Sequence, residues 1–276
     1  MGQSNSQALI IGAGAVGAFY GACLNKAGVS VSAVCRSDYD SIAEHGFVID
    51  SALGDLSFRP ATLLRTVSEV CQPPDYLVLC VKVVDGLDRA ELIRPAVGPD
   101  TAIVLIENGL GIEAELAQAY PDNILLSAVA YVAVSRVATG EIKHFNDGRL
   151  MLGEFPVATG EAASKLSALF ALGGITANVV ESITRERWRK KCVWNAVLNT
   201  VSVVADGADT KTMVTAPGGE ALLREMLREV CVVAAEAGYV STHRGWTLFT
   251  ASSTCACDSV KISRSRPDRI VPRGEV

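Results

Sequence analysis

The stretch that decides the fold is Ala8-Leu9-Ile10-Ile11-Gly12-Ala13-Gly14-Ala15-Val16-Gly17, near the N-terminus. Its first four residues are apolar and predict a short buried strand, and a helical pattern over residues 16–27 follows at once. The three glycines have the G-x-G-x-x-G spacing, which suits a tight turn, a close backbone approach to a pyrophosphate and close helix–strand packing. This context predicts that residues 12–17 bind the phosphates of a dinucleotide at the helix N-terminus. An ordinary strand–helix turn is the alternative.

The first 180 residues alternate between strand and helix patterns. Apolar or alternating strands are predicted at 29–34, 76–81, 101–106, 124–134 and 176–180, and helices at 84–93, 112–120 and 161–172. Residues 46–58 resemble a small hairpin, and residues 141–145 and 149–152 predict two antiparallel edge strands joined by Asn146-Asp147-Gly148. Strands that alternate with helices predict an α/β fold with a doubly wound, mainly parallel sheet.

Strand patterns largely stop near residue 180, and helical periodicity replaces them. Helices are predicted at 184–205, 219–237 and about 242–252. We therefore expect a dinucleotide-binding domain over residues 1–180 and an all-helical substrate domain over residues 181–276.

The composition of the chain disfavours several classes of partner. The chain has 276 residues, 49% of them hydrophobic, and a formal net charge of −5, which disfavours a nucleic-acid partner. The eight cysteines lack the paired spacing of a zinc site, so we expect buried thiols and no metal. No signal peptide and no membrane span of about 20 apolar residues are evident. These features predict a cytoplasmic protein without a membrane partner.

Two charged residues follow the second predicted strand. Arg36 lies 24 positions after Gly12, where NAD-binding versions of this motif hold an acid for the ribose. A guanidinium there suits the 2′-phosphate of NADP. Asp38 is a competing candidate that would take the ribose of NAD. We favour Arg36 and NADPH.

Polar residues also follow two further predicted strands. Lys82 comes directly after residues 76–81, and Asn108 follows residues 101–106. Ligands of open α/β sheets bind outside the carboxyl ends of the strands. We therefore expect Lys82 and Asn108 beside the cofactor.

A polar row marks the first helix of the second half. Lys191, Asn195 and Asn199 are four residues apart, so on an α-helix they share one face. Asparagine is a poor residue inside a helix, and two of them imply a polar ligand or a polar seam between helices. A lysine at the head of an amide row suits a small anionic keto acid, whose carbonyl oxygen it can protonate or polarise.

These residues together resemble the ketopantoate reductase (2-dehydropantoate 2-reductase) family. The resemblance rests on the glycine stretch, on Val81-Lys82, on Asn108-Gly109-Leu110-Gly111 and on the Lys191-Asn195-Asn199 row, and it covers about residues 8–253. It implies a Rossmann-like domain followed by a helical one, and NADPH-dependent reduction of 2-dehydropantoate to pantoate, on the route to coenzyme A. It also implies that Lys191 is the general acid and that Asn108, Asn195, Asn199 and Ser253 bind substrate.

The chain departs from the family pattern at the lysine, at Asp209, where some members have a further substrate asparagine, and at the C-terminal end. The family tryptophan usually precedes the lysine by two, which would select Lys190, whereas the shared helix face selects Lys191, which we prefer. After Ser253 the chain departs from the family: residues 261–276 lack an apolar helical stripe, and Arg269 stands in place of the family glutamate. We expect an incomplete helical domain with exposed apolar surface and weakened activity.

Two other functions fit the same residues. One is a reductase for a different small 2-keto acid, because the sequence does not show the shape of the substrate pocket. The other is a non-catalytic NADP-binding homologue. The sequence leaves open whether the chain forms a homodimer.

Overall fold

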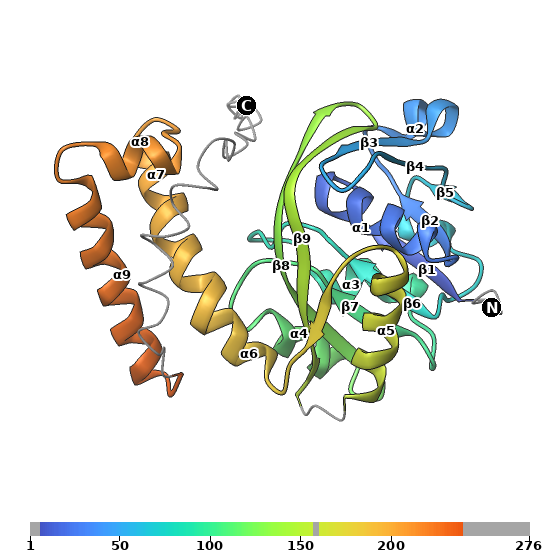
Figure 1. The fold of residues 1–276 in the computed structure, drawn as a ribbon. Helices are drawn as coiled ribbons and strands as arrows, with labels where there is room; N and C mark the ends of the chain where they lie inside the picture. Colours follow the sequence, from blue (N-terminus) through green and yellow to red (C-terminus); the bar gives the residue numbers. More distant parts are fainter. Residues whose placement is uncertain (1–5, 157–159, 240–276) are drawn as a thin grey trace, which may run out of the picture. The chain divides into compact units, whose positions relative to one another are not determined.

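The computed structural model describes residues 6–156 and 160–239, which divide into two compact units, Met1–Cys192 and Val193–Val276 (Figure 1). The division falls later than the boundary near residue 180 that the sequence patterns favour. Helix α6 (Ile183–Glu186) and the helical turns up to Cys192 group with the sheet-bearing first unit.

One mixed sheet organises the first unit. Its strand order is β4-β3-β9-β8-β7-β6-β1-β2-β5, with β10 paired to β9. The parallel centre consists of β5 (Leu63–Leu64), β2 (Ser30–Val34), β1 (Gln7–Ile11), β6 (Tyr76–Leu79), β7 (Ala102–Leu105) and the start of β8 (Leu125–Ala138). Residues 8–11, 77–79 and 102–105 are buried, as continuous apolar strands of a parallel sheet are.

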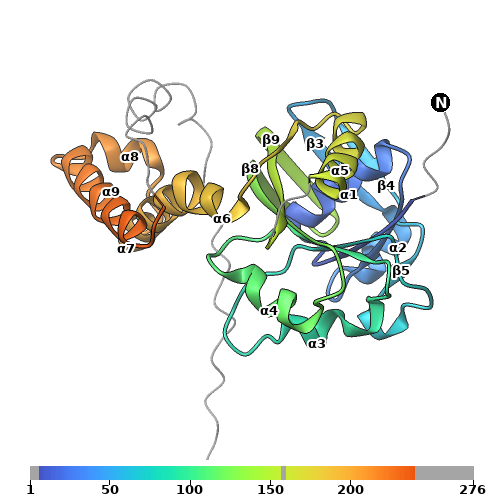
Figure 2. The same cartoon turned by 90° about the horizontal axis from the view of Figure 1, so that it is seen from below.

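Helices cover both faces of this sheet (Figure 2). Helices α1 (Ala15–Lys26) and α5 (Glu161–Leu172) cover one face, and α3 (Arg89–Ile93) and α4 (Ile112–Ala119) cover the other. Each face has its own apolar core, the first around Phe19, Tyr20 and Phe170 and the second around Ile93 and Leu116. The predicted α/β architecture is therefore confirmed.

One prediction, that of two short strands joined by a turn at residues 141–152, is wrong. Residues 141–152 are not two short strands joined by a turn, but lie in one long strand, β9 (Glu141–Phe155), antiparallel to β8. Asp147 has φ +64° and Gly148 has φ +117°, and the β8–β9 register shifts beside them. The Asn-Asp-Gly sequence thus forms a β-bulge, which needs the same left-handed backbone as a hairpin turn. Strand β10 (Ala177–Val179) runs parallel to β9.

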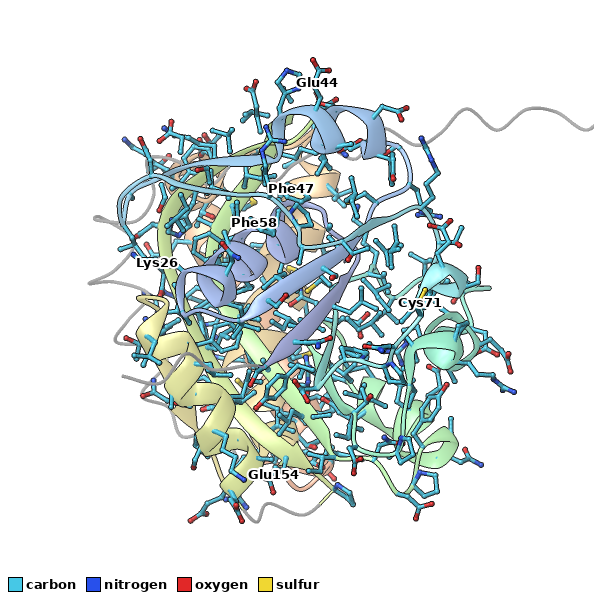
Figure 3. The ribbon with its side chains drawn as sticks, turned by 90° about the vertical axis from the view of Figure 1, so that its right-hand side faces the viewer. Lys26, Glu44, Phe47, Phe58, Cys71 and Glu154 are labelled. Atoms are coloured by element: carbon cyan, nitrogen blue, oxygen red, sulfur yellow. The ribbon has the colours of Figure 1, made fainter. Side chains whose placement is uncertain are left out.

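The predicted hairpin at residues 46–58 is present and lies at the edge of the sheet. Strands β3 (Phe47–Ser51) and β4 (Leu56–Phe58) are antiparallel, and β3 pairs in parallel with β9. Phe47 and Phe58, both labelled in Figure 3, stack with their ring centroids 5.1 Å apart. Helix α2 (Tyr39–His45), which we did not predict, precedes this hairpin.

The described part of the second unit is helical. It contains α7 (Thr200–Val204), α8 (Thr210–Thr215) and α9 (Gly219–Glu236), whose buried contacts include Val197, Met213, Leu223 and Leu227. Several of its apolar side chains are exposed, namely Val203, Val204, Leu222, Val232 and Val233. The helix predicted at 242–252 lies outside the described residues. No helix in the part of the chain that the structure describes is long and apolar enough to cross a membrane.

Candidate cofactor and catalytic site

The three glycines of the N-terminal loop have different surroundings. Gly12 has φ +91°, and a Cβ there would lie 2.8 Å from the carbonyl carbon of Cys80. A Cβ on Gly17 would lie 2.4 Å from the carbonyl oxygen of Gly12, so α1 packs directly on the turn. A Cβ on Gly14, by contrast, would meet nothing within 4 Å. Gly14 therefore leaves open space at the N-terminus of α1, which is where a phosphate would bind.

Arg36 and Asp38, the two candidates for binding the ribose end of the cofactor, both follow β2 but differ in their partners. Arg36 is exposed and forms no ion pair or hydrogen bond among the described residues. Asp38 is engaged at both carboxylate oxygens, by the Ser37 hydroxyl at 2.8 Å and by Arg136 at 2.7 Å. The structure thus leaves the guanidinium of Arg36 available to a ligand and occupies the carboxylate of Asp38.

Lys82 and Asn108 lie at the same edge of the sheet as the glycine loop. Strands β1, β6 and β7 are parallel neighbours, with Ile11 paired to Leu79 and Leu79 paired to Leu105. Their carboxyl ends therefore coincide, and Lys82 and Asn108 follow two of them as exposed side chains. Neither has a hydrogen-bond or ionic partner in the described part of the chain.

A buried arginine, Arg187, forms hydrogen bonds with the loop that carries Asn108. Arg187 is 2% exposed, and its Nε donates to Oε1 of Glu113 at 2.6 Å. Its Nη1 donates to the carbonyl oxygen of Glu107 at 2.8 Å, and its Nη2 to the Ser127 hydroxyl at 2.8 Å. Arg187 therefore ties the start of the helix that carries Lys191 to the loop that carries Asn108.

A second buried arginine holds the side chain of Glu107. Arg89 is 3% exposed and donates to Oε2 of Glu107 at 2.9 Å and to Glu115 at 2.6 Å. Burial raises the pKa of Glu107 to about 7, although the charges of Arg89 and Arg187 act to lower it. Among the described residues, Oε1 of Glu107 is buried without a hydrogen-bond partner.

These buried residues were not predicted, although one signal was present. Arg187 precedes Lys191 by four, so the polar row at four-residue spacing could have been extended by one turn to include it. The partners Glu113 and Ser127 are 74 and 60 residues away in the chain, and no local pattern indicates them.

The helix with the catalytic candidates is not a regular α-helix. Residues Arg187–Cys192 and Asn195–Asn199 form π-helical turns. A π turn bonds i to i+5, so side chains four apart no longer define a face as they do in an α-helix. The side chain of Lys191 lies outside the described atoms, Asn195 is half-buried and Asn199 is exposed. The choice of Lys191 over Lys190 remains a prediction, and π turns frequently occur at functional sites.

The remaining candidate, Ser253, lies outside the described residues. Within the described residues, no group of three or more His, Cys, Asp and Glu side chains could hold a metal ion.

Comparison with known proteins gives consistent results along the chain. The family described as Ketopantoate reductase PanE/ApbA matches residues 8–157, and its C-terminal counterpart matches residues 182–267. A 2-dehydropantoate 2-reductase of Nostoc sp. is 29% identical over 226 residues, 80% of this chain and 70% of the relative.

Solved structures share the fold. The crystal structure of 2-dehydropantoate 2-reductase from Methylococcus capsulatus is 45% identical, with a TM-score of 0.80, over 90% of this chain and 79% of that one. D-mandelate dehydrogenase with NADH and anilino(oxo)acetate has a TM-score of 0.76 at 21% identity, again over 90% and 79% of the two chains, which shows a shared fold alone. On the two family matches and the likeness to the M. capsulatus enzyme, the chain belongs to the ketopantoate reductase family of oxidoreductases.

Proposed function

We propose that this protein reduces 2-dehydropantoate to pantoate with NADPH, a step in pantothenate biosynthesis on the way to coenzyme A. The observation that carries the proposal is the arrangement of the glycine loop, Arg36, Lys82 and Asn108 along one edge of a parallel sheet. The similarity of the chain to 2-dehydropantoate 2-reductases supports the choice of substrate.

The residues at this edge fit a phosphorylated dinucleotide. The open space at Gly14 and the N-terminus of α1 would receive the pyrophosphate, and Arg36 would pair with the 2′-phosphate. Lys82 would lie beside the cofactor. NADPH, when bound, supplies the hydride that the keto acid accepts at its carbonyl carbon.

The row of Lys191, Asn195 and Asn199 would supply the proton and bind the substrate. We assign to the Lys191 ammonium the proton for the substrate carbonyl oxygen, whose negative charge grows as the hydride arrives at carbon. Asn195 and Asn199 would bind the hydroxyl or carboxylate of the substrate, together with Ser253. Asn108 would contact both substrate and cofactor. The product is the 2-hydroxy acid.

The function is tested by following NADPH absorbance with 2-dehydropantoate and with competing keto acids. We expect kcat/KM to be highest for 2-dehydropantoate, and lower for 2-oxoisovalerate and for phenylglyoxylate, the keto acid related to mandelate. A higher kcat/KM for either competitor would assign a different substrate. NADPH binding without turnover on any keto acid would indicate a non-catalytic homologue.

Cofactor choice depends on Arg36 in this proposal. Replacing Arg36 with alanine should weaken NADPH binding about ten- to a hundredfold and leave NADH binding nearly unchanged. The physical reason is the loss of a charge-assisted hydrogen bond to phosphate, worth about 1.5–3 kcal/mol. Dissociation constants from fluorescence titration of both cofactors measure the effect.

The matched control is Arg94→Ala, which removes another exposed arginine, one that pairs with Glu91 on the surface. This variant should bind both cofactors as the wild type does. Equal affinity of the wild-type protein for NADPH and NADH would contradict the role given to Arg36.

A further inference from the structure

An arginine from a distant strand contacts the loop that follows β2. Arg136, near the end of β8, donates from Nη1 to Oδ2 of Asp38 at 2.7 Å across 98 residues of sequence. The side chain of Asp38 is 15% exposed and that of Arg136 is 52% exposed. The contact lies two residues from Arg36, so it concerns the end of the site that would distinguish NADPH from NADH.

The β8–β9 hairpin is built to hold Arg136 in this place. The register of the two strands shifts between Arg136 and Ala138, and such a bulge re-aims the side chain beside it. The hairpin turn at Gly140 packs on α2, because a Cβ there would lie 3.1 Å from the Gly46 carbonyl oxygen and 3.7 Å from Ile42. The Gly140 carbonyl also accepts a hydrogen bond from the Val48 amide.

The side chain of Asp38 does not cap the helix that follows it. Asp38 occupies the N-cap of α2, yet its side chain accepts no hydrogen bond from that helix. Asp88 and Asp209, at the N-caps of α3 and α8, do accept one. Asp38 has ψ 7° and lacks the extended N-cap backbone of Asp88 and Asp209, and its carboxylate accepts from Ser37 and Arg136 instead.

A free carboxylate here would work against NADPH. An acid in this region accepts the ribose hydroxyls of NAD, and its charge would repel a 2′-phosphate. It would also be the nearest ionic partner in sequence for Arg36. Pairing with Arg136 neutralises Asp38 and leaves the Arg36 guanidinium without a competing partner among the described residues.

We propose that Arg136 is a specificity-determining residue, which neutralises Asp38 and so keeps Arg36 available to the 2′-phosphate of NADPH. This inference rests on the proposed use of NADPH. It assigns cofactor selection to an ion pair between the β8–β9 hairpin and the loop after β2, in addition to Arg36 itself.

The test compares Kd for NADP⁺ and NAD⁺, measured by calorimetry without a keto acid, so that turnover is not needed. Arg136→Ala should lower the preference for NADP⁺ about tenfold, because it exposes an uncompensated carboxylate beside the phosphate. The double variant Asp38→Asn/Arg136→Ala should regain the wild-type preference, since it lacks that carboxylate.

Arg149→Ala is the matched control. Arg149 lies on the same hairpin, is half exposed and pairs with Asp147 at 3.0 Å, so its loss changes the net charge equally and also removes an arginine–aspartate pair. It should leave the preference unchanged. The melting temperature of Arg136→Ala should stay close to that of the wild type, because the Arg136 side chain is 52% exposed and ion pairs of exposed arginines contribute little to stability.

The outcomes separate the inference from the proposed function. A wild-type preference for NADP⁺ that survives Arg136→Ala, or a double variant as unselective as the single one, would overturn the role of Arg136 alone. A wild-type protein that binds both cofactors equally would overturn the proposed NADPH dependence together with this inference.

Discussion

Replacing Lys191 with alanine is expected to lower kcat with 2-dehydropantoate by about a hundredfold or more. The reason is the loss of the proton donor, or of the positive charge, beside a carbonyl oxygen that becomes an alkoxide. The affinity for NADPH should persist, because the proposed cofactor contacts come from the glycine loop, Arg36 and Lys82. Steady-state rates and a fluorescence titration of NADPH measure the two parts.

Lys190→Ala is the control for this experiment. On an α-helix, position 190 lies about 100° round from position 191, and its replacement should be milder. The π turn at Arg187–Cys192 changes this angle, because its residues bond five apart and not four. A larger loss for Lys190→Ala than for Lys191→Ala would assign the proton to Lys190.

Replacing Arg187 with alanine is expected to destabilise the first unit by about 3–5 kcal/mol. The change leaves the carboxylate of Glu113, which is 1% exposed, without its ionic partner, and breaking one half of a buried pair costs this much. The Glu107 carbonyl oxygen also loses a donor. Urea denaturation followed by circular dichroism measures the change in the free energy of unfolding.

Two variants make this result specific. Arg185→Ala removes an exposed arginine from the same helix and should change the free energy of unfolding by less than about 0.5 kcal/mol. The double variant Arg187→Met/Glu113→Gln should recover part of the loss, because it removes both buried charges. If Arg187→Ala were as stable as Arg185→Ala, the ion pair would not support the Asn108 loop.

The sequence predicted those parts of the fold that depend on local sterics. The glycine loop is one example, because the left-handed φ of Gly12 and the close contact of Gly17 with the Gly12 carbonyl oxygen arise within a single strand–turn–helix unit. The buried strands were evident as apolar runs for the same reason. The β9 bulge shows the limit, since Asn146-Asp147-Gly148 favours left-handed backbone in a bulge and in a turn alike. Only the partner strand decides between the two.

The candidate site divides in a similar way. Arg36, Lys82 and Asn108 could be placed from strand ends alone, because parallel strands bring their carboxyl ends to one edge. The ion pairs that hold the site in place could not be predicted, because Arg187 meets Glu113, and Arg136 meets Asp38, only after the chain has folded. The π-helical turns also escaped prediction, because apolar and polar spacing alone does not distinguish i+4 from i+5 bonding.

The position of β3 in the sheet has a consequence for synthesis on the ribosome. Strand β3 pairs with Glu141–His144 of β9, about ninety residues later in the chain, and not with any strand made before it. At about 5–20 residues per second, the β3–β4 hairpin waits roughly 5–20 s for its partner strand to emerge. During that time Phe47 and Ile49, which the finished protein buries almost completely, are open to nonspecific contacts. Nascent chains from which Glu141–His144 has not yet emerged should therefore engage chaperones more than longer ones do.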